Sequence, residues 1–149
     1  MDYFLGTFDY SIDDANRLSI PAKFRKVLEQ QHEESNLIIS KEQENCLTLY
    51  PYKLWKTQVG DKIAQLPHSN PAANRLRRLL GINTTEANLD KQGRLNIPAE
   101  YYRHAGIKKN VRIIGSVDTI QLWNPDSHSG VAQNPEEKSL IEEFKEFRI

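Results

Sequence analysis

Short apolar or alternating runs recur along the chain, and such runs are typical of strands buried on one or both faces. They lie at 18–20, 37–39, 47–50, 95–97, 111–114 and 119–123. Two longer stretches space their apolar residues three or four positions apart, which predicts helices near 52–66 and 71–80. Asn70 and Pro71 are expected to open the second of these helices and Gly81 to end it. The apolar stripe of that second helix consists of Ala73, Leu76, Leu79 and Leu80.

One pattern of residues occurs twice in the chain. Residues 12–24 and 89–101 share Asp, Arg, Leu, Ile, Pro and Ala at a constant offset of 77 positions. In each copy the motif Asp-x-x-x-Arg predicts a turn, a short strand follows it, and a proline ends the strand and opens a short helix. These helices are expected near 21–29 and 98–105. The pattern therefore predicts a duplicated unit of mixed α+β class.

The turn in each copy has a residue suited to positive φ. Gly93 adopts that conformation without a steric penalty, and Asn16, at the equivalent position, is the next-best residue for it. The flanking pairs, Asp13 with Arg17 and Asp90 with Arg94, have two compatible interpretations. The aspartate pins the turn through an ion pair, or it orients an arginine that is presented to a phosphate or a guanine edge.

Basic residues surround the two turns. Lys23, Arg25 and Lys26 lie on the predicted helix after the first turn, where they form either a solvated face or a phosphate-binding rim beside Arg17. Lys91 lies within the second turn. The helix after that turn is less basic, because Glu and Tyr replace the equivalents of Lys23 and Arg25.

Two further segments have unassigned partners. The predicted middle helix carries a cluster of Arg75, Arg77 and Arg78, for which a solvated face, pairing between subunits and DNA contact all remain open. A last helix is predicted to begin at 134–135. Its apolar stripe consists of Leu140, Ile141, Phe144 and Phe147, and it needs a partner from this chain or from a neighbouring subunit.

Composition limits the class of protein. Twenty basic and twenty acidic side chains give a formal net charge of zero, so DNA binding would need a local patch or an assembly of several patches. The single cysteine, Cys46, lies in a strand-like run and is predicted to be a core residue. A chain with one cysteine suits a reducing compartment. Neither a signal peptide nor a membrane-length apolar run is visible, which predicts a cytoplasmic protein with no membrane partner.

Motifs for catalysis are missing from the sequence. The four histidines lack metal-ligand spacing, and there is no glycine-rich phosphate loop, nucleophile elbow or paired-carboxylate pattern. The sequence therefore predicts a protein that is not an enzyme and that needs no cofactor and no metal.

The chain resembles the MraZ family of the SpoVT/AbrB-like, swapped-hairpin DNA-binding superfamily. The resemblance covers nearly the whole chain. It rests on 17–25, 49–51 with Trp55, 70–81, 89–95, 103–107 and 122–123. A single Asp-x-x-x-Arg motif is a weak signal, whereas two copies in this order and context are specific.

The resemblance implies a fold and a function. The fold is α+β, a duplicated swapped-hairpin β-barrel unit that forms an intramolecular pseudo-dimer, with helices between and after the repeats. Its parts would be a first repeat at 7–54, a helical insert at 55–82, a second repeat at 83–126 and a C-terminal helix at 127–149. The implied protein is a ring-shaped homo-oligomer at the nucleoid. It would bind short direct repeats of double-stranded DNA and regulate transcription of its own cluster of cell-division and cell-wall genes.

The resemblance implies that the two Asp-x-x-x-Arg motifs face DNA. The residues themselves rank the contacts: Arg17 is expected first and Arg94 second, because each follows a turn and the first copy also has Lys23, Arg25 and Lys26 close by to hold the DNA backbone. The family's first motif usually reads Asp-x-Lys-Gly-Arg, whereas this chain has Ala15 and Asn16 at the middle positions, which removes one possible phosphate contact. The alternative function is an antitoxin-like or other protein-interaction module of the same fold, with a C-terminal tail that contacts the partner.

Overall fold

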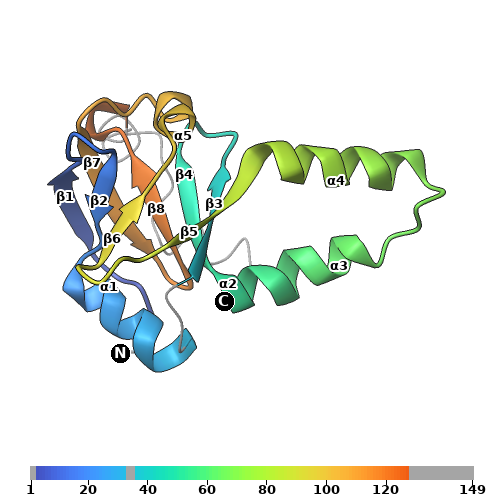
Figure 1. The fold of residues 1–149 in the computed structure, drawn as a ribbon, viewed down its shortest axis with the longest axis horizontal. Coiled ribbons are helices and arrows are strands. Elements are labelled where there is room, and N and C mark those ends of the chain that lie inside the picture. The colour runs from blue at the N-terminus through green and yellow to red at the C-terminus, as the bar shows by residue number, and fades with distance from the viewer. Residues whose placement is uncertain (1–2, 33–35, 128–149) are drawn as a thin grey trace, which may run out of the picture.

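The computed structural model describes residues 3–32 and 36–127 of the chain (Figure 1). Its strands are β1 (Thr7–Ser11), β2 (Arg17–Ser19), β3 (Asn36–Lys41), β4 (Leu47–Pro51), β5 (Thr84–Asn88), β6 (Arg94–Asn96), β7 (Asn110–Ser116) and β8 (Thr119–Trp123). Its helical segments are α1 (Ala22–Val27), η1 (Leu28–His32), α2 (Tyr52–Trp55), η2 (Lys56–Gly60), α3 (Asp61–Ala64), α4 (Pro71–Asn83) and α5 (Ala99–His104). The predicted mixture of helices and antiparallel strands is confirmed.

The strands form two antiparallel sheets in which the repeats alternate. The larger sheet has the order β1-β7-β8-β4-β3-β5, and the smaller is a ribbon of β2 and β6. Four of the six described strand pairings join a strand of the first repeat to a strand of the second: β1 with β7, β2 with β6, β3 with β5 and β4 with β8. The two repeats are therefore interlocked through their backbone hydrogen bonds.

The sequence pattern located six of the eight strands in the described part of the chain and missed β1 and β5. These two strands are themselves equivalent, since they are separated by the same offset of 77 residues. In β5 the side chain of Ala87 is buried, and no large apolar residue marks the strand. In β1 the inward-facing Phe8 and Tyr10 are half-buried. Neither segment has the strongly apolar alternation on which strand prediction depends.

The core lies between the sheets and under the two short helices α1 and α5. Leu18 and Leu95, which face each other in the ribbon, are both fully buried. Phe24 of α1 packs edge-on against Phe4 and Phe8, with ring centroids 5.5 and 5.3 Å apart. Cys46 is also buried, as predicted, and burial raises the pKa of its thiol to about 12. This cysteine is therefore a packing residue with a protonated thiol.

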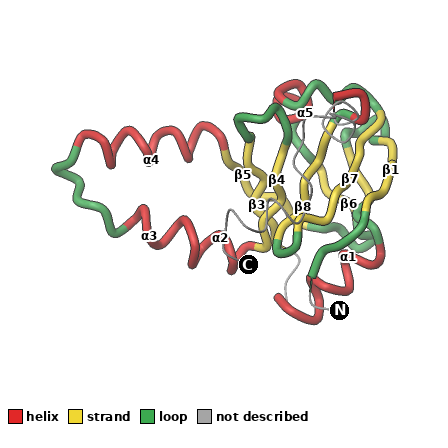
Figure 2. Tube along the Cα trace, turned by 180° about the vertical axis from the view of Figure 1, so that it is seen from behind, coloured by secondary structure: helices red, strands yellow, loops and turns green. Residues whose placement is uncertain are grey.

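The segment from α2 to α4, residues 52–83, forms a helical arm that extends away from the strands (Figures 1 and 2). The predicted start of α4 is confirmed, because the Asn70 side chain accepts hydrogen bonds from the amides of Ala72 and Ala73 and Pro71 is the first helical residue. The predicted end at Gly81 is wrong. Gly81 continues the helix, which runs to Asn83 and passes directly into β5.

The apolar stripe predicted for α4 is only partly covered by the described residues. Ala73 is buried and Leu80 is half-buried, whereas Leu76 and Leu79 are 38% and 44% exposed and the following Ile82 is 65% exposed. The helix predicted from 134 onward lies outside the described residues. None of the helices within the described ranges combines the length and apolarity that crossing a bilayer requires.

Candidate nucleic-acid interface

The first Asp-x-x-x-Arg motif forms a closed turn around the Asp13 carboxylate. One carboxylate oxygen accepts hydrogen bonds from the amides of Ala15 and Arg17, both at 2.9 Å. The other oxygen accepts from Nε of Arg17 at 2.8 Å. The backbone adds a hydrogen bond from the Asn16 amide to the Asp13 carbonyl at 3.0 Å. The aspartate therefore fixes both the turn and the direction of the arginine side chain.

The second motif repeats this geometry. The Asp90 carboxylate accepts from the amides of Gln92 and Arg94 at 2.9 Å and from Nε of Arg94 at 2.9 Å. Gly93 donates its amide to the Asp90 carbonyl at 3.0 Å. The predicted positive φ is present in both copies, 62° at Asn16 and 75° at Gly93. The two copies thus form the same type of turn, although their middle residues differ.

The hydrogen bonds of each turn keep its carboxylate charged, and the ion pair orients its guanidinium. Hydrogen bonds from the amide of the following arginine, more than the ion pair, hold the pKa of Asp13 and of Asp90 below its usual range. The side chains of Arg17 and Arg94 are 39% and 26% exposed. The aspartate binds Nε, and no other residue in 3–32 or 36–127 is hydrogen-bonded to the terminal nitrogens of either guanidinium, so these nitrogens can bind a ligand. This is the geometry in which an arginine forks onto a phosphate or a guanine edge.

The ribbon of β2 and β6 places the two turns at its opposite ends. Arg17 lies opposite Asn96, and Arg94 lies opposite Ser19. Hydrogen bonds continue past the strands into the turns, since the Ile20 amide donates to the Gly93 carbonyl at 3.0 Å and the Ile97 amide donates to the Asn16 carbonyl at 3.3 Å. Each turn is therefore attached to the other repeat.

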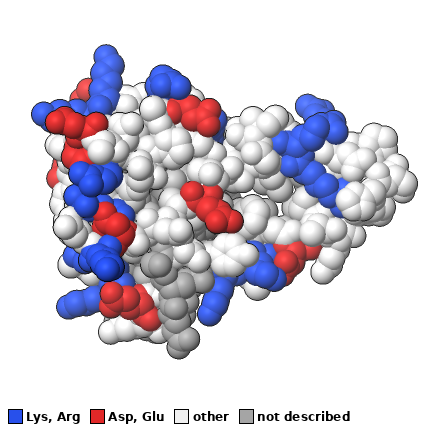
Figure 3. Space-filling view, in the orientation of Figure 1, with Lys and Arg blue, Asp and Glu red and all other residues white. Residues whose placement is uncertain are grey.

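The predicted basic residues differ in their exposure and in the turn beside which they lie. Lys23, Lys26 and Lys91 are exposed. Arg25 is half-buried, its Nε donates to the Ile20 carbonyl at 3.1 Å, and its side chain packs against Gly93 of the second turn. Basic and acidic side chains alternate along the edge of the molecule that carries β1, β2 and α1 (Figure 3). The sequence had associated Arg25 with the first turn through its position after Arg17, and the strand pairing brings it to the second.

Tyr102 supports the first turn from the interior, and the sequence analysis did not identify it. Its hydroxyl donates to the Asn16 carbonyl at 3.1 Å, and its side chain is only 3% exposed. The 77-residue offset makes Tyr102 the equivalent of Arg25. That equivalence was visible in the sequence, but it gave no sign that either side chain contacts the turn of the opposite repeat.

The third arginine cluster lies on the helical arm. Arg77 is structural, because its guanidinium donates to Asn74 Oδ1 at 2.8 Å and to the carbonyls of Ile63 and Leu66, which ties α4 to α3. Arg75 and Arg78 are exposed on α4. Basic side chains are visible along this side of the arm (Figure 3).

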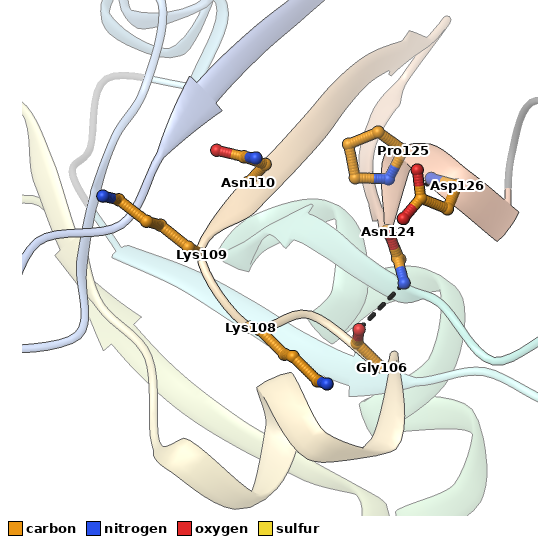
Figure 4. Close-up of a pocket in the computed structure, with 7 residues that line it drawn as sticks. All are labelled: Gly106, Lys108, Lys109, Asn110, Asn124, Pro125 and Asp126. Carbon is orange, nitrogen blue, oxygen red and sulfur yellow. Dashed lines mark hydrogen bonds between the residues drawn. The ribbon is translucent and has the colours of Figure 1, made fainter.

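A separate cavity of about 270 Å³ lies beside the loop between α5 and β7 (Figure 4). It is lined by Gly106, Lys108, Lys109, Asn110, Asn124, Pro125 and Asp126. One wall is held by a hydrogen bond of 2.9 Å from the Asn124 side chain to the Gly106 carbonyl. The predicted site residues do not line this cavity, so it forms no part of the two-turn surface.

Comparison with known proteins identifies the family of the chain. A family model described as "MraZ protein, putative antitoxin-like" matches residues 3–79 and again residues 80–147. The chain belongs to the MraZ family. The double match also confirms the internal duplication that the Asp-x-x-x-Arg motifs indicate.

Several MraZ proteins are similar to this chain over most of its length, and each is named "Transcriptional regulator MraZ". The protein from Mycobacterium ulcerans is 35% identical over 134 residues, which is 90% of each chain. The protein from Thermomicrobium roseum is 32% identical over 130 residues, or 87% of each chain. The protein from Natranaerobius thermophilus is 32% identical over 148 residues, covering 98% of this chain and 99% of its own.

The first turn of this MraZ family member allows a test of its backbone conformation. We expect Asn16→Gly to leave the stability unchanged or slightly raised. We expect Asn16→Val to lower it by roughly 1–2 kcal/mol, because a β-branched side chain resists positive φ. Asn45, with φ of 60° in the turn between β3 and β4, supplies the control. Asn45→Val should cost a similar amount and leave DNA binding unaffected. Equal melting temperatures for the Gly and Val variants at position 16 would contradict the assigned conformation.

Proposed function

We propose that this chain is a sequence-specific, DNA-binding transcriptional regulator that acts on its own cell-division and cell-wall gene cluster. The observation that carries the proposal is the pair of matching turns, each with an aspartate that orients a partly exposed arginine. The name of the related MraZ proteins supports the regulatory role. The protein would act in the cytoplasm at the nucleoid.

In this proposal the two kinds of basic residue have different tasks. The terminal nitrogens of Arg17 and Arg94, which no described residue engages, would form paired hydrogen bonds with O6 and N7 of a guanine in the major groove. The remaining cations Lys23, Arg25, Lys26 and Lys91 would contact phosphates, which sets the position of the protein on the duplex. Specificity would then reside in the turns and general affinity in the cations around them.

The proposed fold unit is the swapped-hairpin β-barrel of the SpoVT/AbrB type. Its support is the alternation of the two repeats in the sheet, above all the pairing of β1 with β7 and of β3 with β5. The proposed division has repeats at 7–54 and 83–126 and a helical insert at 55–82. The C-terminal helix expected from the sequence at 127–149 lies almost wholly outside the described residues. The start of the arm at Tyr52 and its end at Asn83 lie close to the bounds of the insert.

Titration of DNA tests the proposed function. The target is first obtained by selecting bound duplexes from a pool of fragments of the source genome, and short direct repeats are expected among them. Arg17→Ala should keep the fold but weaken binding to the selected duplex by about 1–3 kcal/mol per engaged site. Lys23→Ala should weaken the selected and a scrambled duplex alike and reduce the salt dependence. If the wild-type protein bound both duplexes equally, the proposal of sequence-specific regulation would be wrong.

We further propose that several copies of the chain assemble into a closed ring. Leu76, Leu79 and Ile82 leave an exposed apolar face on α4, and the arm that carries this face extends from the strands. A second copy is the occupant that fits best, because the chain carries no net charge to keep copies apart. A ring that holds several turns together would also bind successive direct repeats with a gain in avidity.

Light scattering tests the assembly. We expect a mass well above that of a dimer of the 17.2 kDa chain. Ile82→Glu should reduce this mass, because it places a charge on the exposed face of α4. Val117→Glu is the matched control, since Val117 is also an exposed apolar residue, at 53%, but lies outside the arm. A monomer at micromolar concentration would refute the proposed ring.

A further inference from the structure

The two turns differ in the side chain that each receives from the opposite repeat. Because β2 and β6 are antiparallel, the end of β2 and the start of α1 lie beside the second turn, as the bond from the Ile20 amide to the Gly93 carbonyl demonstrates. By the same pairing, α5 begins beside the first turn. Arg25 and Tyr102 occupy equivalent positions on these two helices, so one turn receives a cation and the other a phenol.

Arg25 is closely fitted to the second turn. A Cβ atom added at Gly93 would lie 2.5 Å from Cδ of Arg25 and 2.7 Å from its Nε and Nη1. A side chain at position 93 would therefore displace Arg25, and the φ of 75° disfavours most residues other than glycine there. The bond from Nε of Arg25 to the Ile20 carbonyl fixes the guanidinium in this place.

Tyr102 gives the first turn a hydrogen bond without a charge. Its hydroxyl donates to the Asn16 carbonyl, which also accepts from the Ile97 amide. Burial raises the pKa of Tyr102, and the nearby Asp13 raises it further, so the phenol remains a neutral donor. The contact positions the first turn but adds nothing to its attraction for a phosphate.

The charges of the turns differ as a result. Residues 13–17 contain one cation, Arg17, and two carboxylates, for a net charge of −1. Residues 90–94 contain two cations and one carboxylate, for a net charge of +1. Arg25, which reaches this turn from the first repeat, raises the total to +2. Counted over these residues alone, two turns of the same backbone geometry carry net charges of opposite sign.

We infer that the second turn, completed by Arg25 from the first repeat, is the principal phosphate anchor of each subunit, and that the first turn contributes less to affinity. The inference rests on the proposed DNA-binding function and deepens it. It reverses the order expected from the sequence, in which the basic helix was associated with Arg17. In each subunit the second turn would then bind DNA more tightly than the first.

The salt dependence of binding tests this inference, with a labelled duplex of mixed sequence as the probe. Arg25→Gln should weaken binding about tenfold and lower the slope of log affinity against log salt by about 1 for each engaged subunit. Lys26→Gln removes the same charge from the same helix and should have a smaller effect. Lys62→Gln, on the helical arm, is the baseline and should change neither quantity. Arg25→Lys restores a cation and should recover most of the slope even if its melting temperature falls.

Comparison of the two motif arginines completes the test. We expect Arg94→Ala to weaken binding to this duplex more than Arg17→Ala, with similar melting temperatures. The inference is overturned if Arg17→Ala has the larger effect, if Lys26→Gln equals Arg25→Gln, or if Arg25→Lys fails to recover the slope. Any of these results would refute only the ranking of the two turns, because the wild-type protein would still bind DNA. Failure of the wild-type protein to bind any duplex would instead refute the proposed function, and this inference with it.

Discussion

Replacement of Leu18 by alanine should lower the free energy of unfolding by about 3 kcal/mol, within the range for buried leucines. Leu18 is fully buried and lies directly opposite Leu95, which is also fully buried, at the centre of the ribbon that joins the two turns. Truncation removes the contact across the ribbon and leaves a cavity beneath both turns. We therefore expect DNA binding to weaken together with stability, although neither residue can reach DNA.

Urea unfolding measures this effect, and the duplication supplies its controls. Leu95→Ala should cost a similar amount, and the double variant should cost less than the sum of the two, because the side chains contact each other across the ribbon. Leu79→Ala, at an exposed position of α4, should change stability by less than about 0.5 kcal/mol. Simple additivity of Leu18→Ala and Leu95→Ala would count against the central packing assigned to this pair.

Gly115→Ala is expected to cost about 2–3 kcal/mol through overpacking. A Cβ atom at this position would lie 2.5 Å from the carbonyl carbon and oxygen of Phe4 and 2.6 Å from the amide nitrogen of Leu5. These are backbone atoms, so a change of rotamer gives no relief. The segment is also fixed by hydrogen bonds, from the Phe4 amide to the Val117 carbonyl at 2.7 Å and from the Gly115 amide to the Gly6 carbonyl at 2.8 Å.

The same substitution at a second glycine should have the opposite sign. Gly81 lies within α4 and has no atom within 4 Å of an added Cβ, so Gly81→Ala should stabilise the chain by about 0.5–1 kcal/mol through its better helix propensity. Thermal unfolding of the two variants beside the wild-type protein measures both changes. An unchanged midpoint for Gly115→Ala would mean that the segment before β1 can move away from β7 at little cost.

Local sequence signals predicted the turns well. The motif of aspartate and arginine, with Asn16 or Gly93 between them, specified the conformation of both turns, because positive φ and a side-chain hydrogen bond to nearby amides are local properties. The cap at Asn70 is local in the same sense. Gly81 misled the prediction because glycine ends a helix only where the chain adopts positive φ, and here the helix continues to Asn83.

The contacts between repeats could not be predicted from these signals. Which turn Arg25 would serve depends on the register of β2 with β6, and three-residue strands carry too little pattern to define their partner. The interpretation of Arg25 as a companion of Arg17 followed chain order, whereas the antiparallel ribbon carries α1 to the opposite end. The strand β5 was missed for a similar reason, since its pairing with β3 is a tertiary contact that the polar residues of 84–88 do not indicate.

The interlocked strands have a consequence for the synthesis of the protein. Thr7 of β1 pairs with Ile114 of β7, so the first strand leaves the ribosome about 100 residues before its partner exists. At typical rates of translation this interval is several seconds or more. Until their partners emerge, β1, β2, β3 and β4 lack the neighbours that the second repeat supplies, and their unpaired edges can pair with other chains. The hairpin of β3 and β4 can form early, but both sheets are completed only after the second repeat has been made. A nascent chain that stops after its first repeat would therefore be a substrate for chaperones and proteases rather than a smaller working protein.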